Sequence, residues 1–353
     1  MDIKMKIPRI TVTLFLFSPI SAETADDFLQ TGFGARSAAL GGAYSAAVSD
    51  PSALYWNPAG LGHIKSRISG AYGEAHHRKK VKKVQQYEED EFNRLLQMQH
   101  ESIVYDSDKG EPEPVLSSEI QLHTSAALQQ SGNLHYLGAV ALSIGDGALA
   151  AGYGGNRRVT DAAWDNPATT APPHTDVAYL GYGRGSPYFR WGISLFGLQQ
   201  DAVMGRRNAV GGNLGIQYDG LMPNAVIFAV DLRNLGAVES YSGSGFREVK
   251  SLDPVVSYAM RINLGFLASR SDLFLYFGAT TGLSYSKANG ARLNFGISYR
   301  LFSAFHGLLG LNDTAPSLGL GIYPEKYIRF TLSARREVTS KDMAYAGELV
   351  FIF

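Results

Sequence analysis

The sequence contains no cysteine, little charge and no apolar run long enough for a membrane helix. With no Cys among 353 residues, the chain cannot carry disulfides, thiolate metal ligands, a cysteine nucleophile or a cysteine-linked lipid anchor. Charged residues make up 18% of the chain, below the usual ~25%. Lys+Arg 32 balances Asp+Glu 32, so no net field attracts nucleic acid, which we exclude as a partner.

Glycine, tyrosine and phenylalanine are abundant instead. The chain has 39 Gly, 19 Tyr and 18 Phe, and 45% of its residues are hydrophobic. Disordered chains and coiled coils do not support so many apolar and β-forming residues. The composition therefore favours a β-protein.

The first 22 residues have the pattern of a secretory signal peptide. Lys4, Lys6 and Arg9 form a basic start, residues 10–17 form a short apolar run, and small residues precede Glu23. The run is shorter than the ~20 residues of a spanning helix. An exported chain of this kind is either a soluble secreted or periplasmic protein or a transmembrane β-barrel.

From about residue 117 onward, apolar residues recur at every second position. In residues 189–195, Phe, Trp, Ile and Leu alternate with Arg, Gly and Ser, and the runs have the ~9–11 residues of a tilted barrel strand. A soluble sandwich would also alternate, but its polar face would carry more Lys and Glu. The apolar end, residues 349–353, finishes in an aromatic residue and resembles the signal read by the barrel assembly machinery of the outer membrane.

Counting the alternating runs predicts an all-β transmembrane antiparallel barrel of about fourteen strands, as an even-numbered bacterial barrel requires. With a periplasmic C-terminus, three long connections at 77–117, 156–174 and 235–253 fall on the outer side. We expect the barrel domain to occupy residues 64–353, with strands near 64–76, 118–129, 134–155, 175–184, 187–199, 208–218, 224–234, 254–267, 272–284, 291–302, 304–312, 316–323, 326–336 and 342–353.

This arrangement, with an even number of strands and all three long connections on the outer side, depends on reading residues 134–155 as one strand. Gly145-Asp146-Gly147 lies in its middle and has the composition of a hairpin turn. A split there would place the 156–174 loop on the inner side. We therefore predict a kink or bulge at Gly145, Asp146 and Gly147, which glycine permits.

Residues 23–63 do not alternate and carry the most specific motif of the chain. The segment is small, rich in turns and almost uncharged, and includes Gly41-Gly42-Ala43 and Asn57-Pro58-Ala59-Gly60-Leu61. Glycine and alanine permit close packing, so this segment is suited to fill a barrel lumen as a hatch.

This pattern resembles the N-terminal hatch of the FadL-type long-chain fatty-acid transporters. It is also similar to the related PorV/PorQ-like proteins and the FadL-like barrels of spirochaetes. The resemblance implies a fourteen-stranded barrel, a hatch that blocks the pore, and lateral delivery of a hydrophobic ligand through an opening at a kink in the third strand. Gly41, Gly42, Asn57, Pro58 and Ala59 match the hatch motif; their role is either ligand contact or only the hatch's own turn, since Asn-Pro fixes an extended turn.

An amphiphilic ligand would need apolar space for its tail and a guanidinium for a carboxylate head group. The alternation places Phe196 and Leu198 toward the lumen. An inward arginine more often pairs with acids such as Asp231, Glu348 or Asp50, and no single arginine can be chosen. The inward candidates are Arg190, Arg261, Arg292, Arg300 and Arg329.

The 77–117 connection combines a basic start with an acidic block. Such a loop is usually a solvated surface, but its basic end could face lipid phosphates of the outer membrane. Its apolar residues could be the first landing site for a ligand: Phe92, Leu95, Leu96 and Met98.

Enzyme chemistry has little support. There is no Gly-x-Ser-x-Gly elbow, and His76-His77 lacks a third ligand at suitable spacing. We predict a non-enzyme without cofactor or metal, located in the bacterial outer membrane, which admits hydrophobic small molecules, with long-chain fatty acids as the leading ligand. The alternatives are a PorV-like partner or shuttle for secreted proteins and a structural surface barrel.

Overall fold

A computed structural model describes most of the chain. The described residues are 20–21, 32–64, 67–69, 115–130, 133–158, 174–186, 188–202, 205–222, 225–242, 247–265, 272–283, 288–289, 291–302, 304–325, 327–336 and 343–353. The predicted signal peptide lies outside them apart from Ile20–Ser21, as do Phe92, Leu95, Leu96 and Met98.

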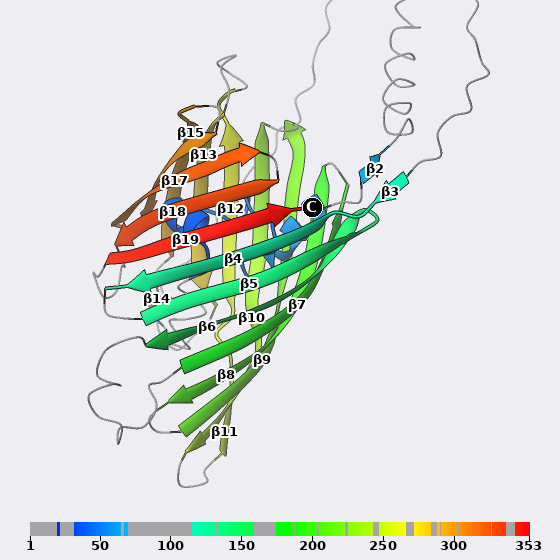
Figure 1. Ribbon diagram of the computed structural model, residues 1–353. Helices are drawn as coiled ribbons and strands as arrows, with labels where there is room; N and C mark the ends of the chain where they lie inside the picture. Colours follow the sequence, from blue (N-terminus) through cyan, green and yellow to red (C-terminus); the bar gives the residue numbers. More distant parts are fainter. Residues whose placement is uncertain are drawn as a thin grey trace, which may run out of the picture.

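One antiparallel sheet closes on itself to form a barrel (Figure 1). The last strand pairs with the first, in a register that places Glu348 opposite Ser125. The strands are β4(Ile120–Gln129), β5(Asn133–Ile144), β6(Gly147–Arg158), β7(His174–Gly185), β8(Phe189–Ala202), β9(Gly205–Met222), β10(Val226–Ser242), β11(Arg247–Ser251), β12(Val255–Asn263), β13(Leu273–Gly282), β15(Arg292–Arg300), β16(Phe305–Asn312), β17(Ala315–Glu325), β18(Ile328–Arg336) and β19(Met343–Ile352).

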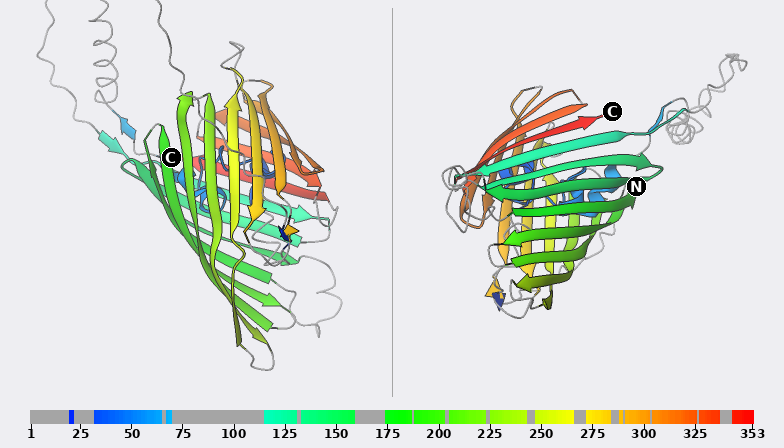
Figure 2. Two further views of the ribbon diagram at one scale, coloured as in Figure 1. Left: turned by 180° about the vertical axis from the view of Figure 1, so that it is seen from behind. Right: turned by 60° about the horizontal axis from the view of Figure 1, so that its bottom comes forward.

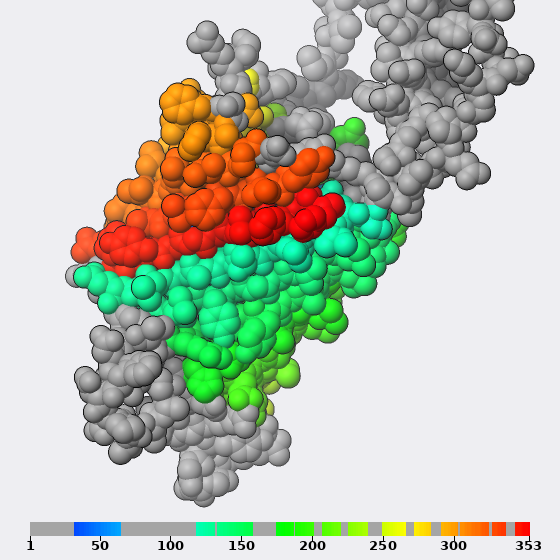
Figure 3. Space-filling view, in the orientation of Figure 1, coloured from blue at the N-terminus to red at the C-terminus, as the bar shows by residue number. Residues whose placement is uncertain are grey.

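The barrel wall is fourteen strands across, as predicted. The sheet has 15 elements, but β11 and β12 follow one another along the same neighbour, β10. Apolar and polar residues alternate through this wall: Ile120 and Leu122 of β4 are exposed, whereas Gln121 and His123 are buried. Seen from outside, β17 to β19 and β4 to β6 form a continuous surface (Figure 3). The apolar outer face is the one that lipid requires, which confirms an outer-membrane β-barrel.

The two ends of the barrel have connections of different length. The chain ends beside the start of β4, where the Phe353 N–H donates to the Ile120 carbonyl at 2.8 Å. At this end the connection after β5 has two residues and that after β7 has three, whereas β6 and β7 are 15 residues apart at the other end. Because bacterial barrels have short periplasmic turns, the end that carries the C-terminus is the inner end.

The predicted kink in a long third strand is wrong. Gly145 and Asp146 form the turn of a hairpin in which Ile144 of β5 pairs with Gly147 of β6. Gly145 has φ +57°, a left-handed conformation that suits glycine in a tight hairpin turn. The registers of β6 with β5 and with β7 are uninterrupted, so the third strand of the wall has no kink.

The first strand and two connections also differ from the prediction. Residues predicted as a strand at 64–76 do not enter the barrel: β2(Arg67–Ser69) pairs with β3(Val115–Ser117) in a separate sheet. This pair precedes β4 at the inner end (Figure 1), so the stem of the predicted external loop 77–117 is not external. Much of the predicted loop 235–253 is strand, in β10 and β11.

A short N-terminal segment lies inside the barrel. We call residues 32–64 the lumenal segment; it contains α2(Ala35–Ala39), α3(Ala53–Trp56) and the 3-10 helix η1(Pro58–His63), and no residue in it is exposed. The strands surround it (Figure 2). A two-residue pair joins β1(Ile20–Ser21) to β14(Ala288–Asn289). None of the helices in the described residues is long and apolar enough to cross a membrane.

Candidate functional site

The turn at Gly41-Gly42 seats the lumenal segment against one wall of the barrel. Both glycines have positive φ, 64° and 84°, which other residues rarely adopt. A Cβ on Gly41 would lie 2.5 Å from the Leu311 carbonyl oxygen of β16. The predicted turn therefore needs glycine for its conformation and, at Gly41, for close approach to the wall.

Asn57 caps the turn that follows and also reaches the opposite wall. Its Oδ1 accepts from the Ala59 N–H at 3.0 Å, and its Nδ2 donates to the Ser45 carbonyl at 3.3 Å and to the Ile216 carbonyl of β9 at 3.2 Å. Pro58 stands at the first position of η1, where its missing N–H costs nothing. These contacts give Asn57, Pro58 and Ala59 a part in the fold of the segment.

The wall beneath this turn is made of glycine. Gly183, Gly192 and Gly215, on β7, β8 and β9, face the turn, and a Cβ on Gly192 would overlap the Pro58 carbonyl. A Cβ on Gly215 would overlap the Asn57 side chain. On the other wall, Gly310 of β16 lies against Gly41. Each of the two turns of the lumenal segment therefore lies directly against the backbone of the wall.

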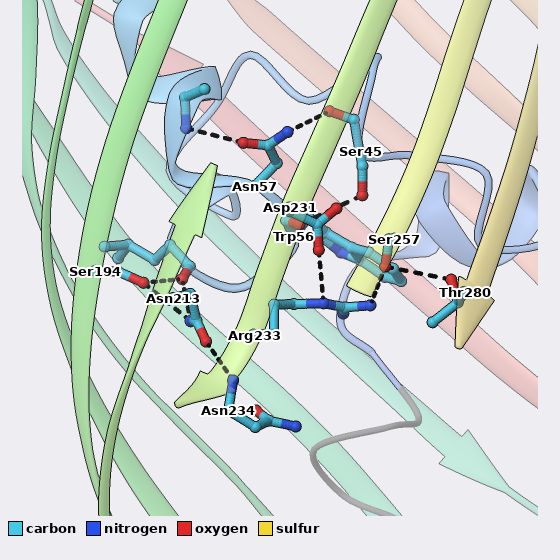
Figure 4. A network of polar contacts seen from close by, with 12 residues as sticks. Ser45, Trp56, Asn57, Ser194, Asn213, Asp231, Arg233, Asn234, Ser257 and Thr280 are labelled. Atoms are coloured by element: carbon cyan, nitrogen blue, oxygen red, sulfur yellow. Dashed lines mark hydrogen bonds and ion pairs between the residues drawn. The ribbon is translucent and has the colours of Figure 1, made fainter. Parts of the chain in front are cut away.

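Wall side chains donate hydrogen bonds to backbone carbonyls of the segment (Figure 4). Ser194 Oγ and Asn213 Nδ2 donate to the Leu54 carbonyl at 2.7 and 3.2 Å. Gln217 Nε2 donates to the Ser45 carbonyl at 2.9 Å, and Ser317 Oγ to the Ala39 carbonyl at 3.1 Å. Each such bond contributes about 1 kcal/mol net, and more is lost when a buried partner is left unpaired.

A buried ion pair lies beside the aromatic side chains of the segment. Arg233 Nε lies 2.9 Å from Asp231 Oδ1, and Arg233 Nη2 donates to Ser257 Oγ at 2.9 Å. The guanidinium lies 5.3 Å from the centre of the Tyr55 ring and 5.7 Å from that of Trp56. Arg233 was not among the sequence candidates, although its partner Asp231 was.

The five candidate arginines do not form one cluster. Arg190 lies 3.9 Å from Asp219, and Arg261 lies over the Phe274 ring at 5.5 Å. Arg261 interacts electrostatically with Arg190 and with Arg36 of α2. Of the remaining three arginines, Arg300 pairs with Asp272 at 2.6 Å. Arg329 is half-buried at the inner end of the barrel, and Arg292 is half-buried at the outer end.

Asp50 joins the segment to the seam between the first and last strands. Ser52 donates to Asp50 Oδ1 from its N–H at 2.9 Å and its Oγ at 2.6 Å, and the Tyr44 hydroxyl donates to Oδ2 at 2.9 Å. Burial by itself raises the pKa of Asp50, but His123 and the Ser52 hydrogen bonds outweigh it, so the pKa lies below its usual value. Asp50 is therefore held as a carboxylate.

Some parts of this site were visible in the sequence and others were not. Phe196 and Leu198 are buried, as the alternation predicts. His123 and the wall glycines were missed, because a lone polar residue or a glycine in a strand carries no signal of what will pack against it. The alternation of β4 could have shown that His123 faces inward, but not that Asp50 lies beside it.

The fold and the occupied lumen define an outer-membrane β-barrel with a lumenal N-terminal segment. No family model and no curated protein matches the chain. Among solved structures it is similar to a deltaS2 mutant of the TodX monoaromatic hydrocarbon channel and to the CymD monoaromatic hydrocarbon channel, each at 9% identity and a TM-score of 0.50. The TodX match covers 93% of this chain and 98% of that one, and the CymD match 91% and 97%.

The toluene transporter TbuX of Ralstonia pickettii matches at 12% identity and a TM-score of 0.48, covering 91% of this chain and 97% of that one. At such low identity, the TodX and CymD matches establish the fold alone. At that level the expected closed β-barrel of fourteen strands is confirmed.

Proposed function

We propose that this chain is a passive outer-membrane channel for hydrophobic small molecules, with the lumenal segment as its hatch. The observation that carries this proposal is the way the segment fills the barrel. At its Gly41 and Asn57 turns it lies on wall glycines that present no side chain, and wall side chains hold it by hydrogen bonds to its backbone carbonyls, while its aromatic residues share one apolar cluster with the wall. Such contacts favour a segment that shifts while the closed wall stays intact.

Long-chain fatty acids are the leading ligand class. A carboxylate head needs a cation, and Arg190 and Arg261 lie near the inner end of the lumen, with Arg261 over the Phe274 ring. Neutral monoaromatic hydrocarbons, which TodX and CymD are described as conducting, would not use those charges. Comparing oleate with toluene therefore tests the head-group assignment.

The sideways exit is assigned to the break between β11 and β12. Leu252 to Pro254 interrupt this strand, Asn234 of β10 has φ +62°, and the register of β9 with β10 shifts between Leu232 and Leu235. Among the described residues, β11 pairs with β10 alone. The wall stays hydrogen-bonded here, since the Leu252 N–H donates to the Gly236 carbonyl at 2.9 Å, but its irregular pairing supports an exit at this place instead of at the third strand.

Uptake by the purified protein tests this proposal. Proteoliposomes containing the full chain should take up labelled oleate faster than protein-free liposomes and saturate with concentration, and bound fatty acid should appear in native mass spectra. Uptake of oleate and toluene at the protein-free rate would contradict it.

A partner role for secreted proteins is the second candidate. The packed lumen supports it, because Tyr44, Tyr55 and Trp56 are all buried there and a channel must first displace them. This role predicts a protein that co-purifies from native membranes together with an absence of saturable oleate binding.

A further inference from the structure

Three potential metal ligands meet where the lumenal segment touches the barrel seam. Asp50, His123 of β4 and Glu348 of β19 each offer one ligand atom, and these atoms lie within 4.8 Å of one another. His123 pairs with Val350, two residues beyond Glu348, so both side chains point into the lumen from neighbouring strands.

The His123 ring is fully buried and, among the residues that the structure describes, has no hydrogen-bond partner. Its side chain has 0% exposure, and neither Nδ1 nor Nε2 makes a hydrogen bond. Nδ1 lies 3.5 Å from Asp50 Oδ1 without hydrogen-bond geometry. Buried polar atoms are rarely left unsatisfied, so an imidazole aimed at two carboxylates indicates a missing ligand.

Both carboxylates are held in place by other groups. Asp50 accepts hydrogen bonds from Ser52 and Tyr44, and Glu348 accepts from the Arg36 N–H at 3.2 Å. Metal sites characteristically orient their ligands with such outer contacts. The Arg36 guanidinium also acts on Glu348 electrostatically, but its ring contacts are with Tyr44 and Tyr323 at 5.8 and 6.0 Å.

We propose that Asp50, His123 and Glu348 form a binding site for a divalent transition-metal cation such as Zn²⁺. One imidazole nitrogen with two carboxylate oxygens suits Zn²⁺ and its neighbours, whereas Mg²⁺ and Ca²⁺ prefer oxygen alone. Three protein ligands leave one position for water. Tetrahedral Zn²⁺ ligands lie roughly 3.4 Å apart when each bond is about 2.1 Å, so binding draws the three side chains together.

A cation at this place would connect the lumenal segment to both strands that close the barrel. Asp50 is the segment's contribution, and His123 and Glu348 belong to the first and last strands of the wall. Occupancy therefore fixes the segment to the seam. The site stands on its own geometry and does not depend on what the barrel conducts.

Zinc binding to the full-length protein in detergent tests the proposal. After EDTA treatment and dialysis, wild type should bind one more Zn²⁺ than His123→Gln by titration calorimetry, and Zn²⁺ but not Mg²⁺ should raise its unfolding temperature. Glu348→Gln should weaken the same site at least about 100-fold. Co²⁺ should give visible absorption bands in wild type that Glu348→Gln loses.

Two controls separate this site from other histidines. His135→Gln removes another buried lumenal imidazole and should bind as wild type does. The double variant His76→Ala/His77→Ala removes the two adjacent histidines of the sequence and should keep the site. Equal stoichiometry and affinity in wild type, His123→Gln and Glu348→Gln, with heat-modifiable gel migration showing that all are folded, would overturn the proposal, as would wild type that does not prefer Zn²⁺ over Mg²⁺.

Discussion

Single side chains decide how firmly the lumenal segment is held. Asn57 is fully buried and bonds to Ser45, Ala59 and Ile216. Asn57→Ala removes all three bonds and leaves the buried Ala59 N–H without its acceptor, although Gln217 still donates to the Ser45 carbonyl; the cost is about 1–3 kcal/mol. We expect this variant to admit ions more readily, measured as single-channel conductance in planar bilayers, whereas Asn133→Ala on β5 should conduct as wild type does. Equal conductance in Asn57→Ala and wild type would show that Asn57 does not help to close the lumen.

Charge at the inner end should distinguish ligands. Arg261→Leu removes a cation beside Phe274 without touching the lumenal segment's turns, so oleate uptake should fall several-fold while toluene uptake is unchanged. Arg300→Leu is the matched control, because Asp272 already neutralises that guanidinium. A parallel loss of both ligands in Arg261→Leu would show that its role is structural.

For single residues, the sequence predicts the turns of the lumenal segment better than it predicts which wall residues contact that segment. The Gly41-Gly42 and Asn57-Pro58-Ala59 turns follow from local chemistry, namely positive φ and side-chain capping, and such chemistry is readable along the chain. The approach of His123 to Asp50 and that of Arg233 to the Tyr55 and Trp56 rings are long-range contacts. Their identity depends on barrel closure and strand register, which a local pattern does not contain.

Among the elements, β8 offers a direct test of glycine-to-backbone packing. Gly192→Val would force its side chain into the Pro58 carbonyl, with a cost of about 1–3 kcal/mol for overpacking. On the same strand, Gly197→Val meets nothing within 4 Å. Gly192→Val should unfold at lower temperature than Gly197→Val, and the reverse order would contradict the observed seating of η1.

The β11 edge tests the position of the exit. Val249 of β11 and Val210 of β9 are 60% and 67% exposed, and the chain has no native cysteine. A bulky maleimide on Val249→Cys should slow oleate uptake, whereas the same label on Val210→Cys should not. Equal effects at the two positions would place the exit elsewhere.

Element boundaries were predictable where alternation was clean and failed where a glycine turn was ambiguous. Gly145-Asp146-Gly147 suits a bulge and a hairpin equally well, and what decides between them is pairing along the whole of β5 and β6. The predicted strand at 64–76 failed for a related reason: its residues 67–69 pair with residues 115–117 rather than with the barrel. The short apolar pattern could not specify a partner.

For the whole molecule, the predicted number of strands was right, although two of the individual strands that made up this number were wrong. Removing residues 64–76 from the barrel and splitting 134–155 into β5 and β6 leaves fourteen strands, and it keeps the last residue of β6 and the first residue of β7 at the outer end. Alternation, length and even parity are global constraints on a barrel. They survive local errors, so the fold was predictable from sequence even though the hairpin between β5 and β6 was not.

If the proposed function is right, ligand passage requires the lumenal segment to move against the barrel wall. A Cβ on Gly62 of η1 would lie 3.3 Å from the Arg190 Cβ of β8, close to the ~3.5–4.5 Å of a disulfide. Gly62→Cys/Arg190→Cys, made in a chain with no other cysteine, locks the two together when oxidised and frees them when reduced.

Oleate uptake by proteoliposomes carrying this double variant is the decisive measurement, with Arg190→Cys alone as the control for the lost charge. The account predicts that oxidation abolishes uptake, that reduction restores it to the level of Arg190→Cys, and that the single variant is insensitive to oxidation. Equal uptake by the oxidised and reduced double variant, with the disulfide confirmed by mass spectrometry, would contradict it.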